Sequence, residues 1–333
     1  MTQSEYADEI LDSNAISPTD KDGRPIPVTI PVMLAPGVKV VYTTRLGGVS
    51  QGDAAGLNLG GKNGDDPAHV AANRAALADE IDARLSLVSQ IHSGVAVDVD
   101  ETYADNRAYG FDATGGTVPE DEDGGATVVE ADAQVTTRRG VALGVFAADC
   151  LPVLLADAES GVVGVAHCGR RGLQQGVIGE TVRMMTAKGA RADRIVATLG
   201  PCICGDCYEV GEAIASEFDA QFPGTATTTR FGGPGIDIAA AALRELADAG
   251  IAGDRIVESR PRVAAATQYL SEDGELAELC RTDGEGATEL AERIDGVRHS
   301  LCTLENPLWY SHRRASLANK NGEGRMLALI VME

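Results

Sequence analysis

Three residues of types that commonly bind metals stand at the ends of apolar, strand-like runs. His92 closes the run 87–92, Cys150 follows close on the run 141–148, and His167 closes the run 162–167. If these strand ends share one edge of a sheet, the three side chains converge. Two imidazoles and one thiolate match the three protein ligands of a catalytic zinc site, whose fourth position stays open for water or substrate. His92, Cys150 and His167 are therefore candidate metal ligands.

The spacing of these residues leaves two other interpretations open. Cys150 could be a small core residue, with both histidines hydrogen-bonded at strand ends. Alternatively, Cys150 could act as a nucleophile with His167 or His92 as its base, which needs no metal. The neighbouring Asp149 is a candidate general acid or base in either kind of enzyme.

A second group of cysteines lies in the glycine-rich segment GPCICGDCYEVG, which contains Cys202, Cys204 and Cys207. Three thiols within six residues could bind a metal or a redox partner. No matching CxxC pair stands elsewhere, and Cys280 and Cys302 are isolated in sequence. Small side chains in a tight loop are therefore the favoured interpretation.

Arginines beside glycines are the candidate anion-binding residues. They occur in the segments TTRLGGVS, HCGRRG and YSHRR and are Arg45, Arg170, Arg171, Arg313 and Arg314. A guanidinium next to a glycine-flanked backbone can hold phosphate or carboxylate through paired N–H donors. For any one of them alone, a surface ion pair is the simpler interpretation.

The composition excludes several classes of partner. The 333 residues carry 28 Lys and Arg against 50 Asp and Glu, a formal charge of -22, so nucleic acid and anionic membranes are repelled. The longest apolar stretch, 141–156, contains Asp149 and is shorter than the roughly 20 residues that span a bilayer. The acidic N-terminal segment has no signal-peptide pattern, so we expect a cytoplasmic protein whose cysteines are reduced thiols or metal ligands.

The elements that must position these residues alternate irregularly between strands and helices. Asp66 and Pro67 are a helix-starting pair and predict a helix to about Ile81. Apolar runs predict strands over 87–92, 141–148, 151–157, 162–167 and 194–199. Helical spacing predicts a helix over 173–185 and a second over 237–249, which Asp237 caps. Since no linker separates two folding units, the sequence predicts one α+β domain.

Three segments are expected to lie outside this core. Residues 1–36 are polar and proline-rich and predict a flexible N-terminal arm, with the catalytic domain over 37–333. Residues 98–132 hold eleven acids and one base, which predicts a solvated acidic loop, with an insertion near 101–130. The charged, alanine-rich segment 261–298 predicts a further insertion of one or two surface helices.

Read together, the motifs resemble those of one family. The blocks TTRLGGVS, GLNLG, QIH, ADAQVT, ADCLPVLLAD, VAHCGRRG, GPCICGDCYEVG, SHRR and GR occur in this order and resemble the signature of the YfiH/DUF152 family, long called polyphenol oxidases or laccase-domain proteins. The resemblance implies a single-domain sandwich of mixed β-sheets with flanking helices. It also implies that His92, Cys150 and His167 hold zinc.

The resemblance further implies a purine nucleoside phosphorylase that accepts adenosine, inosine, guanosine and methylthioadenosine and also deaminates adenosine. Purine nucleosides and phosphate are then the expected partners. Arg45, Arg171 and Arg314 match family motifs, so we expect them to bind phosphate. A true laccase is not expected, because multicopper centres consume many imidazoles and this chain has five histidines.

Two departures from the family keep other functions open. The family usually has Ala and Trp where this chain has Cys168 and Arg170. The second hypothesis is a Cys/His hydrolase or editing amidase that acts on a cell-wall precursor. The third is a catalytically weakened nucleoside-binding regulator, which the cation at Arg170 suggests.

Overall fold

Two mixed β-sheets form the centre of the structure. The computed structural model describes residues 17–115 and 127–333. The larger sheet has six strands, in the spatial order β1 (Thr29–Ala35), β2 (Val38–Thr43), β13 (Met326–Met332), β7 (Val141–Ala147), β3 (Arg84–Val88) and β5 (Gly110–Ala113). The smaller has five, in the order β10 (Val196–Leu199), β8 (Leu151–Asp157), β9 (Val162–Cys168), β6 (Ala133–Thr136) and β4 (Ala96–Asp98).

Most neighbouring strands are antiparallel, but the larger sheet contains two parallel pairs and the smaller sheet one. Strand β3 runs parallel to both β5 and β7, and β4 runs parallel to β6. The last strand, β13, lies between β2 and β7. The C-terminal segment thus joins strands from the first half of the chain.

The sheets pack face to face because alternate residues of each strand point to opposite sides. Val40, Leu143 and Ile330 of the larger sheet share one core with Leu154 and Val165 of the smaller sheet. The intervening residues of the larger sheet face the other way, which produces a separate core on its outer surface.

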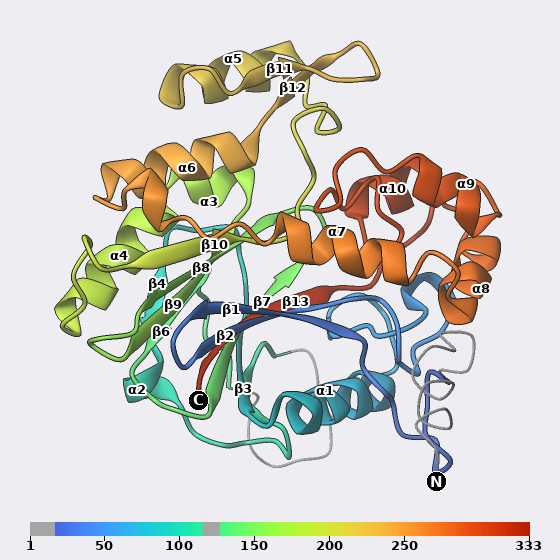
Figure 1. Ribbon diagram of the computed structural model, residues 1–333, viewed down its shortest axis with the longest axis horizontal. Helices are drawn as coiled ribbons and strands as arrows, with labels where there is room; N and C mark the ends of the chain where they lie inside the picture. Colours follow the sequence, from blue (N-terminus) through green and yellow to red (C-terminus); the bar gives the residue numbers. More distant parts are fainter. Residues whose placement is uncertain (1–16, 116–126) are drawn as a thin grey trace, which may run out of the picture.

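Helices cover the outer faces of both sheets (Figure 1). Helix α1 (Pro67–Ile81) contributes Leu77 and Ile81 to the outer core of the larger sheet. The outer face of the smaller sheet packs against α3 (Arg170–Gln174), α4 (Val177–Ala187) and α6 (Ile238–Asp248). The result is a four-layer α/β/β/α sandwich.

The remaining elements lie beside these layers. They are α2 (Val99–Thr102), α5 (Glu212–Gln221), α7 (Arg260–Tyr269), α8 (Gly274–Thr282), α9 (Leu290–Asp295), α10 (His312–Leu317) and the hairpin of β11 (Ala226–Thr228) and β12 (Pro234–Ile236). None of the helices in the described ranges combines the length and apolar character needed to cross a membrane.

The structure confirms the predicted α+β sandwich and several of its elements. Asp66 caps α1 by accepting a hydrogen bond from Ala68 N at 2.8 Å, and α1 ends at Ile81 as expected. Asp237 caps α6 in the same way through Ala240 N. Strands β7, β8 and β9 match the predicted apolar runs closely, whereas the run 87–92 is only partly strand, because β3 ends at Val88.

The predicted N-terminal arm is too long. Residues 1–16 lie outside the described part of the chain, but Thr29–Ala35 forms β1, the edge strand of the larger sheet. Ile30, Val32 and Leu34 alternate with exposed or half-buried residues and enter the core between the sheets. Pro31 obscured this period-two pattern in the sequence, because proline is uncommon within strands. It is tolerated here because β1 is an edge strand.

The acidic segment is also more structured than predicted. Within residues 98–132, of which 116–126 lie outside the described part, α2 and β5 form regular structure. Asp112 and Asp132 are buried at 5% and 0% exposure. Their charged partners, Arg74 for Asp112 and His167 for Asp132, lie 38 and 35 residues away in sequence, so a local count of charges could not separate these two from solvated acids.

The segment 261–298 is helical, as expected, but it holds three helices, α7, α8 and α9, where one or two surface helices were predicted. These helices are not confined to the surface, because Val263, Leu276 and Leu290 pack into the core between the sheets.

Candidate functional site

One buried carboxylate positions both candidate histidines. Asp132, directly before β6, accepts hydrogen bonds on Oδ1 from His92 N at 2.9 Å and His167 Nδ1 at 2.8 Å. Its Oδ2 accepts from the backbone N–H groups of Ile91 and Ser93 and from Ser93 Oγ. The loop after β3 is thereby fixed against β9, and His92 is held with a positive φ of 61°.

His92, Cys150 and His167 converge as the sequence suggested. Their ligand atoms all lie within 4.8 Å of one another, and Cys150 Sγ is 3.6 Å from His92 Nε2. The two imidazole rings meet edge to face, with centroids 4.9 Å apart. His92 lies in the loop after β3, Cys150 in the turn between β7 and β8, and His167 on strand β9.

The electrostatics of this group favour a thiolate at Cys150. Burial raises the pKa of Cys150, but the charge and hydrogen bond of His167, together with His92, lower it to about 6. Burial lowers the pKa of His167, but the Cys150 thiolate and the Asp132 carboxylate raise it to about 9. Without a metal, these opposite shifts favour a thiolate on Cys150 beside an imidazolium on His167.

The donor set fits a zinc ion. Because His167 Nδ1 faces Asp132, its Nε2 remains available as a ligand, and a carboxylate behind a histidine is the usual outer support of such a ligand. A Cβ built on Gly169 would lie 2.8 Å from His92 Cδ2 and 3.0 Å from Cys150 Sγ. Glycine at this position leaves room beside the three ligand atoms.

Asp149 lies beside the group in a strained conformation. Its φ is 98°, a region that non-glycine residues rarely adopt. Thr303 Oγ1 donates to its Oδ1 at 2.6 Å, and Arg313 N donates to its Oδ2 at 2.7 Å. Ile203 N donates to its backbone carbonyl. These contacts from remote segments fix the carboxylate where the strain would otherwise displace it.

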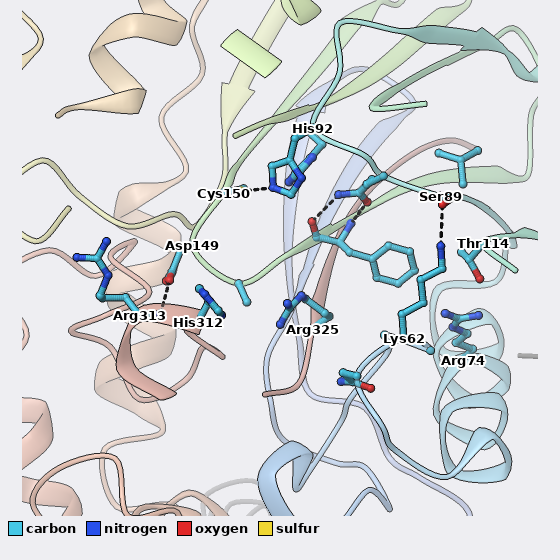
Figure 2. Close-up of a pocket in the computed structure, with 18 of the residues that line it drawn as sticks. Lys62, Arg74, Ser89, His92, Thr114, Asp149, Cys150, His312, Arg313 and Arg325 are labelled. Atoms are coloured by element: carbon cyan, nitrogen blue, oxygen red, sulfur yellow. Dashed lines mark hydrogen bonds between the residues drawn. The ribbon is translucent and has the colours of Figure 1, made fainter. Parts of the chain in front are cut away.

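A cavity of about 520 Å³ opens over these residues, a volume typical of small-molecule sites (Figure 2). Phe146 and Tyr208 supply aromatic surface to its wall. Its polar lining, besides Asp149 and the three candidate ligands, comprises Lys62, Asn63, Arg74, Ser89, Gln90, Thr114, His312, Arg313 and Arg325.

The cavity has cations that the sequence analysis did not select. In the view of Figure 2, Lys62 and Arg74 gather on one side with Ser89 and Thr114. Lys62 Nζ donates to Ser89 Oγ at 2.8 Å, and no carboxylate within residues 17–115 and 127–333 pairs with it. Arg74 is fully buried. Its Nη1 pairs with Asp112 Oδ2 at 2.6 Å, whereas its Nη2 has no hydrogen-bond partner among the described residues. Lys62 can therefore offset the charge of a bound anion, and Arg74 Nη2 can donate a hydrogen bond to it.

The expectation that Arg45, Arg171 and Arg314 bind phosphate needs correction, because none of them lines the cavity. Arg45 is buried and lies 3.1 Å from Asp283, and Arg314 lies 2.7 Å from Glu285. Both guanidinium groups therefore neutralise buried carboxylates. Arg171 is exposed on α3.

The sequence did contain signals for the residues that were missed. Asp132 stands in the quoted block ADAQVT, where one acid precedes an apolar strand. Arg325 stands in the quoted block GR, and Arg74 stands in the pair NR within α1. These short motifs did not show which arginines line the cavity.

Arg170 is expected to be peripheral to the chemistry. It does not line the cavity, and its Nη1 donates to Gln174 Oε1 at 2.7 Å within α3. For the activity on inosine that the motifs imply, the variant Arg170→Trp should change turnover by less than about tenfold, or about 1.4 kcal/mol, and should leave the metal content unchanged. Steady-state kinetics with metal analysis checks this. A loss of several orders of magnitude with the metal retained would place Arg170 against the reacting anion.

Fold and site together define an α+β sandwich protein with a candidate His₂Cys metal-binding cavity. The model of the family described as "Multi-copper polyphenol oxidoreductase laccase" matches residues 39–333. The chain belongs to this family, the YfiH/DUF152 family that its motifs resemble.

Named relatives and a solved structure agree with this membership. A purine nucleoside phosphorylase of Corynebacterium glutamicum is 40% identical over 236 residues, covering 70% of this chain and 87% of the relative. An adenosine deaminase, RL5, from an unknown prokaryotic organism is 36% identical, covering 67% and 83%. The crystal structure of the Neisseria meningitidis DUF152 protein NMB0706 aligns with a TM-score of 0.64 and 29% identity, covering 92% of this chain and 99% of that one.

Proposed function

We propose that this protein is a zinc-dependent purine nucleoside phosphorylase that also deaminates adenosine at the same cavity. The observation that carries the proposal is the cavity itself, which combines a His₂Cys group with the Lys62 ammonium and with Arg74 Nη2, which is unpaired in the described part of the chain. The names of the relatives in Corynebacterium glutamicum and the unknown prokaryote support the two reactions.

His92, Cys150 and His167 would hold the zinc ion. When bound, zinc supplies a Lewis acid and lowers the pKa of a coordinated water molecule, which is the chemistry that attack on C6 of adenine requires. Asp132 orients His167 through Nδ1 and holds the backbone of His92.

Asp149 is the proposed proton carrier for both reactions. Its two fixed oxygens border the cavity beside Cys150. In phosphorolysis a phosphate oxygen bonds to C1′ of the ribose, the bond from C1′ to N9 breaks, and the departing purine takes up a proton. In deamination a proton must reach the leaving amino group. A carboxylate that is held in place by Thr303 and Arg313 can take a proton from dihydrogen phosphate or from the attacking water and pass it to the leaving group.

Lys62 and Arg74 are the proposed phosphate ligands and replace Arg45, Arg171 and Arg314. The hydroxyl groups of Ser89 and Thr114 border the same part of the cavity. Positive charge held there offsets the negative charge of phosphate and positions it for attack on C1′. Such positioning and electrostatic stabilisation are large contributions to enzymatic rate.

The Cys/His hydrolase remains a second candidate, because the pKa of Cys150 is lowered to about 6 beside His167. A thiolate of this kind is ready to act as a nucleophile if no metal occupies the site. The Cys150 variants described in the Discussion separate the two functions.

The proposed activity predicts that inosine is converted to hypoxanthine and ribose 1-phosphate only when phosphate is present. Lys62→Ala should raise the KM for phosphate by about tenfold, as the loss of one charge-assisted contact of about 1.4 kcal/mol. Product analysis by chromatography, with and without phosphate, measures both effects.

Lys39→Ala is the matched control, since Lys39 pairs with Glu333 on the larger sheet and does not line the cavity. It should leave the KM for phosphate unchanged. Hypoxanthine release at the same rate without phosphate would indicate hydrolysis and would refute the phosphorylase assignment.

A further inference from the structure

A second group of metal-type ligands lies apart from the His₂Cys group. Cys204 and Cys207 follow β10, and Cys302 and Glu305 stand about a hundred residues later. Their ligand atoms all lie within 4.8 Å of one another, although no two of the cysteines form a disulfide. Each segment contributes two ligands three positions apart, a CxxC pair and a CxxE pair. Cys202, which the sequence grouped with Cys204 and Cys207, is not part of this set.

The burial of these side chains is hard to explain by packing alone. Cys207 and Cys302 are 0% and 1% exposed, and the side chain of Glu305 is fully buried. Glu305 Oε1 lies 3.5 Å from Cys207 Sγ, on the side where the thiols gather. Arg230 offsets the charge of this carboxylate at 3.1 Å, so the three thiols beside it can lose their protons only if a further cation joins the group.

The backbone already holds the four residues in a ligating arrangement. Cys207 N donates to the carbonyl of Cys204, which closes the CxxC turn, and Cys204 N lies 3.4 Å from Cys302 Sγ as a donor to sulfur. Glu305 Oε2 accepts from the backbone N–H groups of Arg298 and His299. These contacts leave the thiols and Oε1 to face one another.

The charge around the cluster also suits a divalent cation. Three thiolates and one carboxylate would carry four negative charges, of which a divalent ion offsets two. Arg230 Nη1 lies 3.1 Å from Glu305 Oε1 and offsets a third. Thiolate-rich, four-ligand sets select zinc over calcium and magnesium. A second cavity of about 340 Å³, lined in part by Cys204 and Cys302, gives an ion a route to the site.

We propose that Cys204, Cys207, Cys302 and Glu305 form a structural zinc site, separate from the candidate catalytic centre. Its four protein ligands leave no open position, which is typical of structural sites, whereas the His₂Cys group has three ligands and lies in the wall of the larger cavity.

The site would act as a cross-link that supports the cavity. The segment of Cys204 and Cys207 leads into Tyr208, which lines the cavity. The residue after Cys302 is Thr303, whose hydroxyl fixes Asp149. An ion that joins the two segments would therefore stabilise the positions of Tyr208 and Asp149 without touching the substrate.

Metal content tests the proposal directly. Zinc in purified, dialysed protein is measured for the wild type, for Cys207→Ala and for Cys280→Ala. Cys280 is the matched control, a buried thiol on α8 outside the cluster. We expect Cys207→Ala to lose one zinc per chain and Cys280→Ala to lose none. Equal zinc in all three folded proteins would overturn the proposal, as would a native disulfide between Cys204, Cys207 or Cys302 found by mass spectrometry.

Cobalt spectroscopy keeps the test decisive if Cys207→Ala fails to fold. In Cys150→Ser the candidate catalytic centre has no thiolate, so any thiolate-to-cobalt charge-transfer absorption after reconstitution with Co²⁺ must come from the cluster. We expect a strong band of this kind. Cobalt that binds without such a band would overturn the proposal.

Discussion

Replacing Cys150 with serine is expected to reduce kcat/KM for inosine and adenosine by about 10³-fold or more, equivalent to about 4 kcal/mol. It should also lower the zinc content by one equivalent per chain. The reason is the loss of the only thiolate in the His₂Cys group, whose ligand atoms lie within 4.8 Å of one another. Metal analysis and steady-state kinetics on the same preparation measure both changes.

Two further variants separate a metal ligand from a nucleophile. Cys150→Asp keeps an anionic ligand but cannot act as a thiol nucleophile, so it should retain more metal and more activity than Cys150→Ser. Cys168→Ala is the matched control. Cys168 is a buried thiol at the end of β9, directly after His167, and it is not a candidate ligand. Wild-type activity that survives complete zinc removal but disappears in both Cys150 variants would favour the Cys/His hydrolase instead.

Removing the carboxylate of Asp112 is expected to lower the free energy of unfolding by about 3–5 kcal/mol, the usual cost of breaking a buried ion pair. Arg74 Nη1 lies 2.6 Å from Asp112 Oδ2, and both side chains are almost completely buried. The variant Asp112→Ala leaves the Arg74 guanidinium buried without this carboxylate. Chemical denaturation at neutral pH measures the change.

Asp105→Ala is the control, because Asp105 belongs to the same acidic segment but pairs with Arg84 in an exposed position. Exposed ion pairs contribute little, so we expect a change below about 0.5 kcal/mol. If the free energy of unfolding fell by less than about 1 kcal/mol in both variants, the acidic segment would behave as the solvated loop that its charge suggests. The ion pair of Arg74 and Asp112 would then contribute little to stability.

The sequence alone predicted features that depend on neighbouring residues. Asp66 and Pro67 mark the start of α1 because a helix cap is a contact within one turn. Strands β7, β8 and β9 were predicted because buried strands are continuous apolar runs. His92, Cys150 and His167 were selected because each lies at or near the end of such a run, and the family motifs supported the choice.

The tertiary structure decided which charged and sulfur-containing side chains act together. Asp132 reaches His92 across 40 residues, Arg45 meets Asp283 across 238, and Cys204 meets Cys302 across 98. In the sequence, each of these residues resembles many others of its type. A charge becomes a ligand, a buried ion pair or a solvated group according to its partner, and packing of the two sheets and their helices brings those partners together.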